Sequence, residues 1–127
     1  MKQLTIVLLL LIPTLALGHS MSPGFEVERT VSSALTKEYV LTNNYDFPAV
    51  YKIEVFTKDM EPAVDWKTSK EVYKILPNGK KVVKIKFKTD EKRKLVVCST
   101  LTDIGKNNEK ASLISRICSR LIIHRIR

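Results

Sequence analysis

The stretch 81-KVVKIKFK-88 decides the fold, because apolar and cationic side chains alternate along it. The odd positions from 83 to 87 hold valine, isoleucine and phenylalanine, and the even positions from 84 to 88 hold lysine. Successive side chains of a β-strand point to opposite faces, so this period of two predicts a strand with one buried and one solvated face. A helix would distribute the same residues around its axis.

The same alternation recurs along most of the chain. Within residues 49–57, Tyr51, Ile53 and Val55 are expected to point inward, although Phe56 interrupts the polar pattern of the other face. Turn-forming Asn, Asp, Pro and Gly residues separate the runs, which also include residues 25–29, 38–42 and 94–101. About seven short antiparallel strands result, and they predict an all-β fold, a seven-stranded immunoglobulin-like β-sandwich in a single domain.

The first 18 residues have the features of a cleaved signal peptide. Lys2 gives a short positive region, residues 4–17 are apolar, and Ala16-Leu17-Gly18 offers small residues at the positions that a signal peptidase reads. We therefore expect cleavage after Gly18, export to the periplasm and a folded domain at residues 19–127. No later stretch reaches the roughly 18 apolar residues that a spanning helix needs, so no membrane span is expected.

The chain is strongly basic, with a formal net charge of +9. Removing Lys2 with the signal peptide leaves +9 minus 1, or +8. This balance favours anionic partners such as a carboxylate or an envelope surface, and export argues against nucleic acid. The lysines within residues 80–88 indicate mainly the solvated face of one strand, which would contribute to a positive sheet face.

Both cysteines, Cys98 and Cys118, lie in the part expected to be exported. An even count in an oxidising compartment predicts one disulfide between neighbouring strands. Two buried free thiols are the alternative, whereas the absence of a Cys-x-x-Cys spacing argues against a redox pair.

The end of the chain, 111-ASLISRICSRLIIHRIR-127, is apolar in both parities. We expect the odd-numbered apolar residues from 113 to 123 to face the core, while Ile114, Cys118 and Ile122 make the opposite face apolar as well. An edge strand with two apolar faces is prone to aggregation unless something pairs with it, so this pattern raises the question of a partner.

Five segments together resemble the N-terminal domain of periplasmic pilus-assembly chaperones. They are 25-FEVERTVSS-33, 39-YVLTNN-44, 47-FPAVYKIEVF-56, 72-VYKILPNGKKVVKIKF-87 and 114-ISRICSRLIIHR-125. The resemblance implies an immunoglobulin-like domain whose last strand lends apolar side chains to an incomplete pilus subunit. Strand addition of this kind is a recurrent mode of recognition. Ala111, Leu113 and Ser115 fall where the family places its donor residues, and Ile117 or Ile114 could contribute after a register change. The expected donor residues are therefore Leu113, Ser115 and Ile117.

The resemblance also implies an anchor for a subunit's terminal carboxylate, made of one base on the first strand and one on the last. Arg120 matches the second position, whereas the first holds Val31, so Arg29 is the substitute. Arginine can hold a carboxylate through two parallel hydrogen bonds. The alternative is that Arg29, Arg116 and Arg120 are solvated edge charges. Family members with a disulfide between the last two strands exist, and Cys98 with Cys118 would suit that arrangement.

Several functions stay open at this point. Members of the family normally have two domains with the binding cleft between them, whereas one domain is expected here. A minimal chaperone, a homodimer, a truncated gene and a scaffold that lost the activity all stay open. A structural or interaction module of an envelope-spanning secretion or surface assembly is the main alternative. The sequence holds none of the hydrolase, zinc-protease or phosphate-loop motifs, so we predict no enzyme and no cofactor. A remote alternative is a copper-binding sandwich that uses the amine and imidazole of His19.

Overall fold

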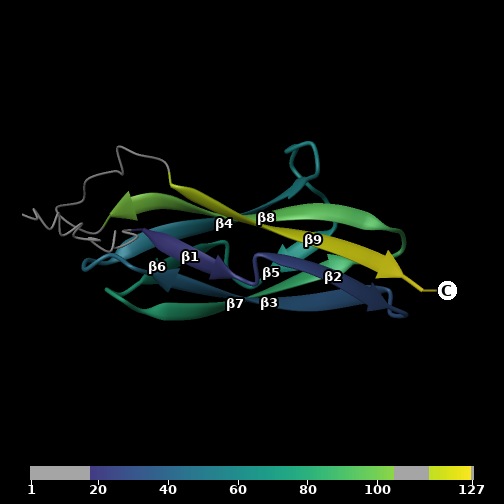
Figure 1. Ribbon diagram of the computed structural model, residues 1–127, viewed down its shortest axis with the longest axis horizontal. Helices are drawn as coiled ribbons and strands as arrows, with labels where there is room; N and C mark the ends of the chain where they lie inside the picture. The colour runs from purple at the N-terminus through teal and green to yellow at the C-terminus, as the bar shows by residue number, and fades with distance from the viewer. Residues whose placement is uncertain (1–17, 105–114, 127) are drawn as a thin grey trace, which may run out of the picture.

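The computed structural model describes residues 18–104 and 115–126, which form a two-layered β-sandwich (Figure 1). These residues contain no helix long and apolar enough to cross a membrane. Their strands are β1 (His19–Ser22), β2 (Phe25–Thr30), β3 (Ala34–Asn43), β4 (Ala49–Thr57), β5 (Trp66–Thr68), β6 (Val72–Ile75), β7 (Lys80–Lys88), β8 (Arg93–Ile104) and β9 (Arg116–Arg125).

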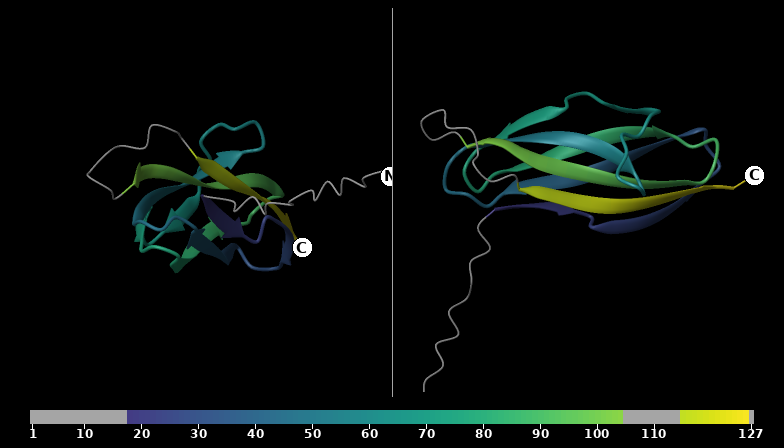
Figure 2. Two further views of the ribbon diagram at one scale, coloured as in Figure 1. Left: turned by 60° about the vertical axis from the view of Figure 1, so that its left-hand side comes forward. Right: turned by 90° about the horizontal axis from the view of Figure 1, so that it is seen from above.

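The strands form two sheets that face each other. One sheet has the order β1-β3-β7-β5, and the other has the order β2-β9-β8-β4-β6. In the view of Figure 1, β3 and β7 lie in the lower layer, while β4, β8 and β9 lie in the upper one, and Figure 2 shows the same layers from two further sides. This architecture confirms the predicted immunoglobulin-like sandwich.

The core lies between the two inner faces, where the alternating residues meet. In β7, Val83, Ile85 and Phe87 are fully buried while the intervening lysines are exposed, as the opening stretch predicts. The inward-facing side chains of β4 are also buried, and those of β8 and β9 complete the core: Tyr51, Ile53, Val55, Leu95, Val97, Leu121 and Ile123. Burial of these apolar side chains is the main stabilising term of the fold.

The described residues form nine strands rather than about seven, mainly because the first strand changes sheets. β1 pairs antiparallel with β3, whereas β2 pairs parallel with β9. The chain crosses between the layers at Pro23 and Gly24, and the Ser22–Pro23 peptide bond is cis. In addition, Trp66 begins a short strand, β5, which comes before β6.

A buried asparagine joins the turns at one end of the sandwich. The Asn43 amide nitrogen donates to the carbonyls of Phe47 (2.9 Å) and Ile75 (3.1 Å), and its oxygen accepts from the Tyr51 hydroxyl (2.9 Å). The adjoining turn requires Gly79, because a Cβ atom there would lie 2.9 Å from the Leu76 carbonyl oxygen. A buried polar side chain needs such partners, and here it ties β3, β4 and β6 together.

Candidate functional site

The last strand has two halves with different neighbours. β8 pairs with β9 from Arg116 to Ile123, but β2 pairs only with residues 120–125. Residues 120–125 therefore lie inside the sheet, which corrects the expectation that the whole last strand is an edge. Residues 116–119 have a paired strand on one side only, and we call this segment the open edge.

Hydrogen bonds show which backbone groups of the open edge are directed outward. Leu101 N–H donates to the carbonyl of Ser115 (2.8 Å), so the odd-numbered residues of this stretch bond to β8. Arg120 N–H instead donates to the carbonyl of Gly24 (3.0 Å), so the even-numbered residues face away from β8. Because alternate residues of an antiparallel strand direct both backbone groups to the same side, the N–H and C=O of Arg116 and Cys118 face the rim.

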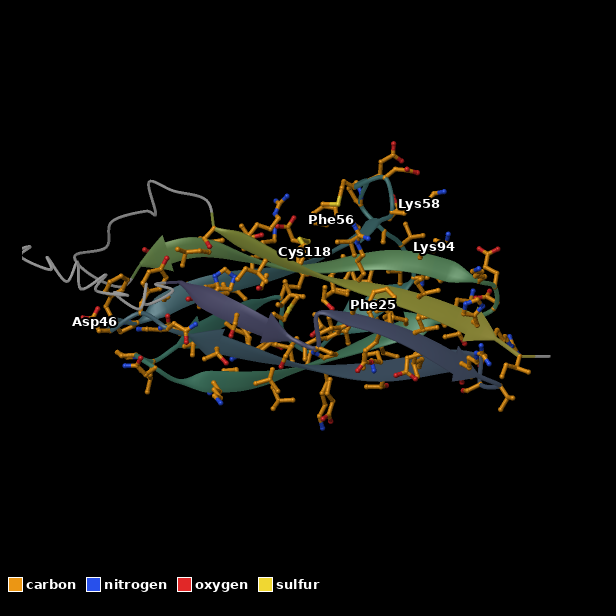
Figure 3. The ribbon with its side chains drawn as sticks, in the orientation of Figure 1. Phe25, Asp46, Phe56, Lys58, Lys94 and Cys118 are labelled. Carbon is orange, nitrogen blue, oxygen red and sulfur yellow. A yellow bond between two sulfur atoms is a disulfide. The ribbon has the colours of Figure 1, made fainter. Side chains whose placement is uncertain are left out.

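The disulfide holds the open edge against its inner neighbour. Cys98 and Cys118 are directly opposite each other in the β8–β9 register, with 4.1 Å between their Cα atoms, and they form the disulfide that the sequence predicts. Cys98 is buried, whereas Cys118 is exposed on the outer face of the sheet (Figure 3). The cross-link closes a loop of 20 residues, which is worth about 3 kcal/mol in the chain-entropy account.

The structure describes only some of the predicted donor residues. Ile117 points inward, is half-buried and packs against the core of its own domain. Ser115 is half-buried, and its hydroxyl lies 3.5 Å from Nδ1 of His19. Leu113, together with Ala111 and Ile114, lies outside the described residues. Their donor role therefore stays a prediction.

The two arginines of the predicted carboxylate anchor lie apart along the β2–β9 pair, and their anchor role stays a prediction. In the parallel register, Phe25 lies opposite Arg120, and Arg29 lies opposite His124. Arg29 is thus four residues further along the strand pair than Arg120, or about 13 Å at the usual rise per residue. The reason is the register set by the crossing at Pro23 and Gly24, which the residue types alone do not reveal.

Arg120 instead belongs to a basic and apolar hollow on the outer face of the five-stranded sheet. The hollow has a volume of about 730 Å³ and also contains Lys58 and Lys94. Phe25, with 59% of its surface exposed, and Met60 supply apolar walls. Figure 3 places Lys58 and Lys94 on the same upper side of the molecule as Cys118. These two lysines are the functional candidates that the sequence analysis did not single out, although both occupy outward positions at the ends of β4 and β8.

Arg116 is exposed on the outer face, and three neighbouring side chains hold it there. Its guanidinium carbon lies 5.3 Å from the centre of the Phe56 ring, its Nε donates to Thr100 (3.1 Å), and its Nη2 lies 3.7 Å from the Glu54 carboxylate. A guanidinium over an aromatic face is an attractive arrangement. This contact also explains why Phe56 interrupts the polar pattern of β4.

A salt bridge between the layers fixes where the open edge begins. Lys37 of β3 makes ion pairs with Glu26 and, at 2.7 Å, with Glu28, both on β2. The Lys37 side chain is only 12% exposed, and burial lowers its pKa. The bridge holds β2 in place, and β2 determines how much of β9 is paired on both sides.

His19 connects three segments next to the open edge. Its Nε2 lies 3.0 Å from the Ser99 carbonyl, its Nδ1 faces Ser115, and its ring packs 4.4 Å from the Tyr51 ring. Burial lowers the pKa of this imidazole, and the bond to the Ser99 carbonyl opposes the shift. The ring that the copper hypothesis requires is therefore engaged in hydrogen bonds within the interior. His19 lies beside the start of β9, whereas His124 lies near the end of that strand, so the two histidines are far apart.

No protein-family model and no curated protein matches the sequence. Solved structures do match. The structure of the Salmonella enterica SafA pilin in complex with the SafB chaperone gives a TM-score of 0.68 at 14% identity, over 85% of this chain and 54% of that one. The Escherichia coli chaperone DraB gives 0.66 at 16% identity, over 86% and 55%. The chain thus spans about half the length of the chaperones it matches.

A different class of protein shares the fold as well. WR4, a Caenorhabditis elegans MSP family member, matches with a TM-score of 0.63 at 11% identity, over 83% of this chain and 96% of WR4. The chaperone similarities fall on N-terminal domains. At such identities the comparisons show the fold, and this protein has the immunoglobulin-like fold of the N-terminal domain of periplasmic pilus chaperones.

Proposed function

We propose that this protein is a periplasmic, chaperone-like binding protein that holds subunits of a pilus or surface appendage by adding their strands to its last strand. The single observation that carries the proposal is the open edge, where β9 continues beyond the reach of β2 with two residues whose backbone groups face outward. A subunit strand laid there would extend the sheet in line with β2. Backbone hydrogen bonds would supply affinity in this mode, and side-chain pockets would supply specificity.

Named residues have distinct roles in this proposal. Arg116 and Cys118 offer the backbone groups of the edge, and the disulfide holds them in an extended conformation. Ile117, Ser115 and Leu113 are the donor side chains, with Ile117 shared between the core and the client. Arg120 receives a client carboxylate together with Lys94, which lines the same hollow. Arg29 is not used, because it lies four residues away from Arg120 along the β2–β9 pair.

Export to the periplasm is part of the proposal. A signal peptide at residues 1–18 would deliver the domain to the periplasm, where the disulfide forms. The Gly18 carbonyl accepts a hydrogen bond from Asn44 N–H (2.8 Å), and cleavage after Gly18 would remove this bond. N-terminal sequencing of the secreted protein identifies the cleavage position.

A proline placed at the edge tests the strand-addition proposal. Because Arg116 N–H faces away from β8, Arg116→Pro removes an outward donor without breaking a bond of the β8–β9 ladder. Arg116→Ala is the matched control, since it removes the same side chain and keeps the N–H. We expect Arg116→Pro to reduce capture of co-expressed subunits at least about tenfold relative to Arg116→Ala, the equivalent of one to two hydrogen bonds. Equal capture by both variants, with both folded, would rule out addition at this edge.

The second candidate function is a stable structural or interaction module. The match over 96% of WR4, an MSP family member, supports it, because in WR4 this fold makes up nearly the whole chain. Affinity purification of the tagged protein from periplasm and from envelope fractions separates the two. A chaperone recovers soluble, unassembled subunits, whereas a structural module recovers the assembled apparatus.

A further inference from the structure

A second charged site lies on the opposite side of the molecule, on the outer face of the four-stranded sheet. A hollow of about 410 Å³ opens there between β3, β5 and β7. Its lining residues are Ala34, Asp65, Trp66, Lys67, Lys86, Phe87 and Lys88. In Figure 1 this face belongs to the lower layer, away from β8 and β9 and therefore away from the open edge.

Two lysines lie opposite each other in this hollow, and neither forms an ion pair among the described residues, although Asp65 also lines the hollow. Lys67 of β5 is directly opposite Lys86 of β7 in the antiparallel register, and both side chains are exposed. Like charges in directly opposed positions destabilise a sheet. In the part of the chain that the structure describes, the neighbouring lysines of β7 do have ion pairs, Lys84 with Glu38 at 3.6 Å and Lys88 with Asp90 at 3.4 Å, but neither Lys67 nor Lys86 has one.

The frame around these lysines is fixed by hydrogen bonds. The Arg93 guanidinium donates to the carbonyls of Val64 (2.5 Å), Asp65 (3.2 Å) and Lys88 (3.2 Å), and Lys88 N–H donates to the Asp65 carbonyl (3.1 Å). The Trp66 indole packs against the core and donates to Ala63 (3.1 Å). The segment before β5 is therefore tied to the end of β7, and the hollow exists before any ligand binds.

We propose that this hollow binds a phosphate group, carried either by a small phosphomonoester or by a lipid headgroup. Lys67, Lys86 and Lys88 line the hollow together with the small Ala34, and of these three lysines only Lys88 forms an ion pair, with Asp90. A phosphomonoester carries nearly two negative charges and three strong acceptor oxygens, so it can bridge the opposed lysines and remove their repulsion. A single carboxylate would leave one of the two ammonium groups uncompensated.

Titration of the folded protein with inorganic phosphate and with glycerol phosphate tests the site, at constant ionic strength, by NMR of the backbone amides. We expect saturable shifts confined to residues around 34, 65–67 and 86–88. The double variant Lys67→Gln/Lys86→Gln should weaken binding at least about tenfold, since two charge-assisted contacts are lost. Lys74→Gln is the matched control, because Lys74 is an exposed lysine on β6 of the other sheet. It should leave the affinity unchanged, while Asp65→Asn should raise it.

Vesicle flotation distinguishes the two sources of phosphate. Vesicles of phosphatidylcholine with phosphatidic acid should retain the wild-type protein and Lys74→Gln, but not the double variant, if the ligand is a lipid headgroup. Saturable binding of glycerol phosphate without such retention assigns the site to a soluble ligand. The proposal is overturned if neither probe binds, or if the double variant and Lys74→Gln bind both probes equally. None of these results bears on strand addition, which uses the other sheet.

Discussion

The two halves of β9 carry similar residues but have different surroundings. Residues 116–119 and residues 120–125 both alternate an inward apolar or small side chain with an outward one. Only the second half lies between two strands, because β2 begins at Phe25, opposite Arg120. The difference shows that the reach of a neighbouring strand, and not the composition of β9 itself, decides where this chain can accept a partner strand.

The largest expected effect contrasts one inward side chain from each half. Leu121 is fully buried, so Leu121→Ala should lower the free energy of unfolding by about 2–5 kcal/mol through lost burial and the cavity left behind. Ile117 is only half-buried, so Ile117→Ala should cost about 1 kcal/mol. Urea denaturation monitored by circular dichroism measures both. Equal losses would mean that Ile117 belongs to the core as fully as Leu121 and would remove it from the donor set.

Loss of the disulfide is the next effect in size, and it should be concentrated in the open edge. Cys98→Ala/Cys118→Ala should lower the free energy of unfolding by about 3 kcal/mol, as the chain-entropy model gives for a closed loop of 20 residues. Because β2 still covers residues 120–125, hydrogen exchange should accelerate more in residues 116–119 than in that half. A uniform acceleration along β9 would show that the disulfide stabilises both halves alike.

A smaller effect should come from pH, through His19 beside the open edge. The pKa of His19 lies below 6.5 in the folded chain because the ring is buried. As the pH falls through 6.5, the imidazole is protonated in the unfolded chain but stays neutral in the folded chain, so stability should fall as the pH drops from 7 toward 5.5. Above pH 7 this histidine contributes no pH dependence. His19→Gln should remove the slope in this window, and a variant that loses stability in parallel with the wild type would contradict the assignment.

Residues with a local pattern could be assigned from the sequence, while those that depend on distant partners could not. Alternation placed Val83, Ile85 and Phe87 in the core, since burial on one face of a strand is a local property. By contrast, no local signal reveals the parallel register of β2 on β9, which separates Arg29 from Arg120 by four residues. Asparagine is common in turns, so its residue type does not reveal that Asn43 is buried, which depends on carbonyl groups from residues 47 and 75.

The candidate site was predicted less completely than the fold for the same reason. The apolar end of the chain indicated a strand in need of a partner, but it did not show that β2 already covers half of that strand. Lys58 and Lys94 join Arg120 only when the outer face of three strands is assembled. Likewise, the opposed lysines of β5 and β7 become a site only through their register.

Hydrogen exchange of single amides in β9 measures most directly whether residues 116–119 form an open edge. The amides of Ile117 and Ser119 should be protected by β8, and those of Ile122 and His124 by β2, whereas Arg116 and Cys118 should exchange as rapidly as exposed groups. Binding of a client strand should then slow exchange at Arg116 and Cys118 selectively. If these two amides are as strongly protected as Ile122 and His124 in the isolated protein, the edge is already closed and the account is wrong.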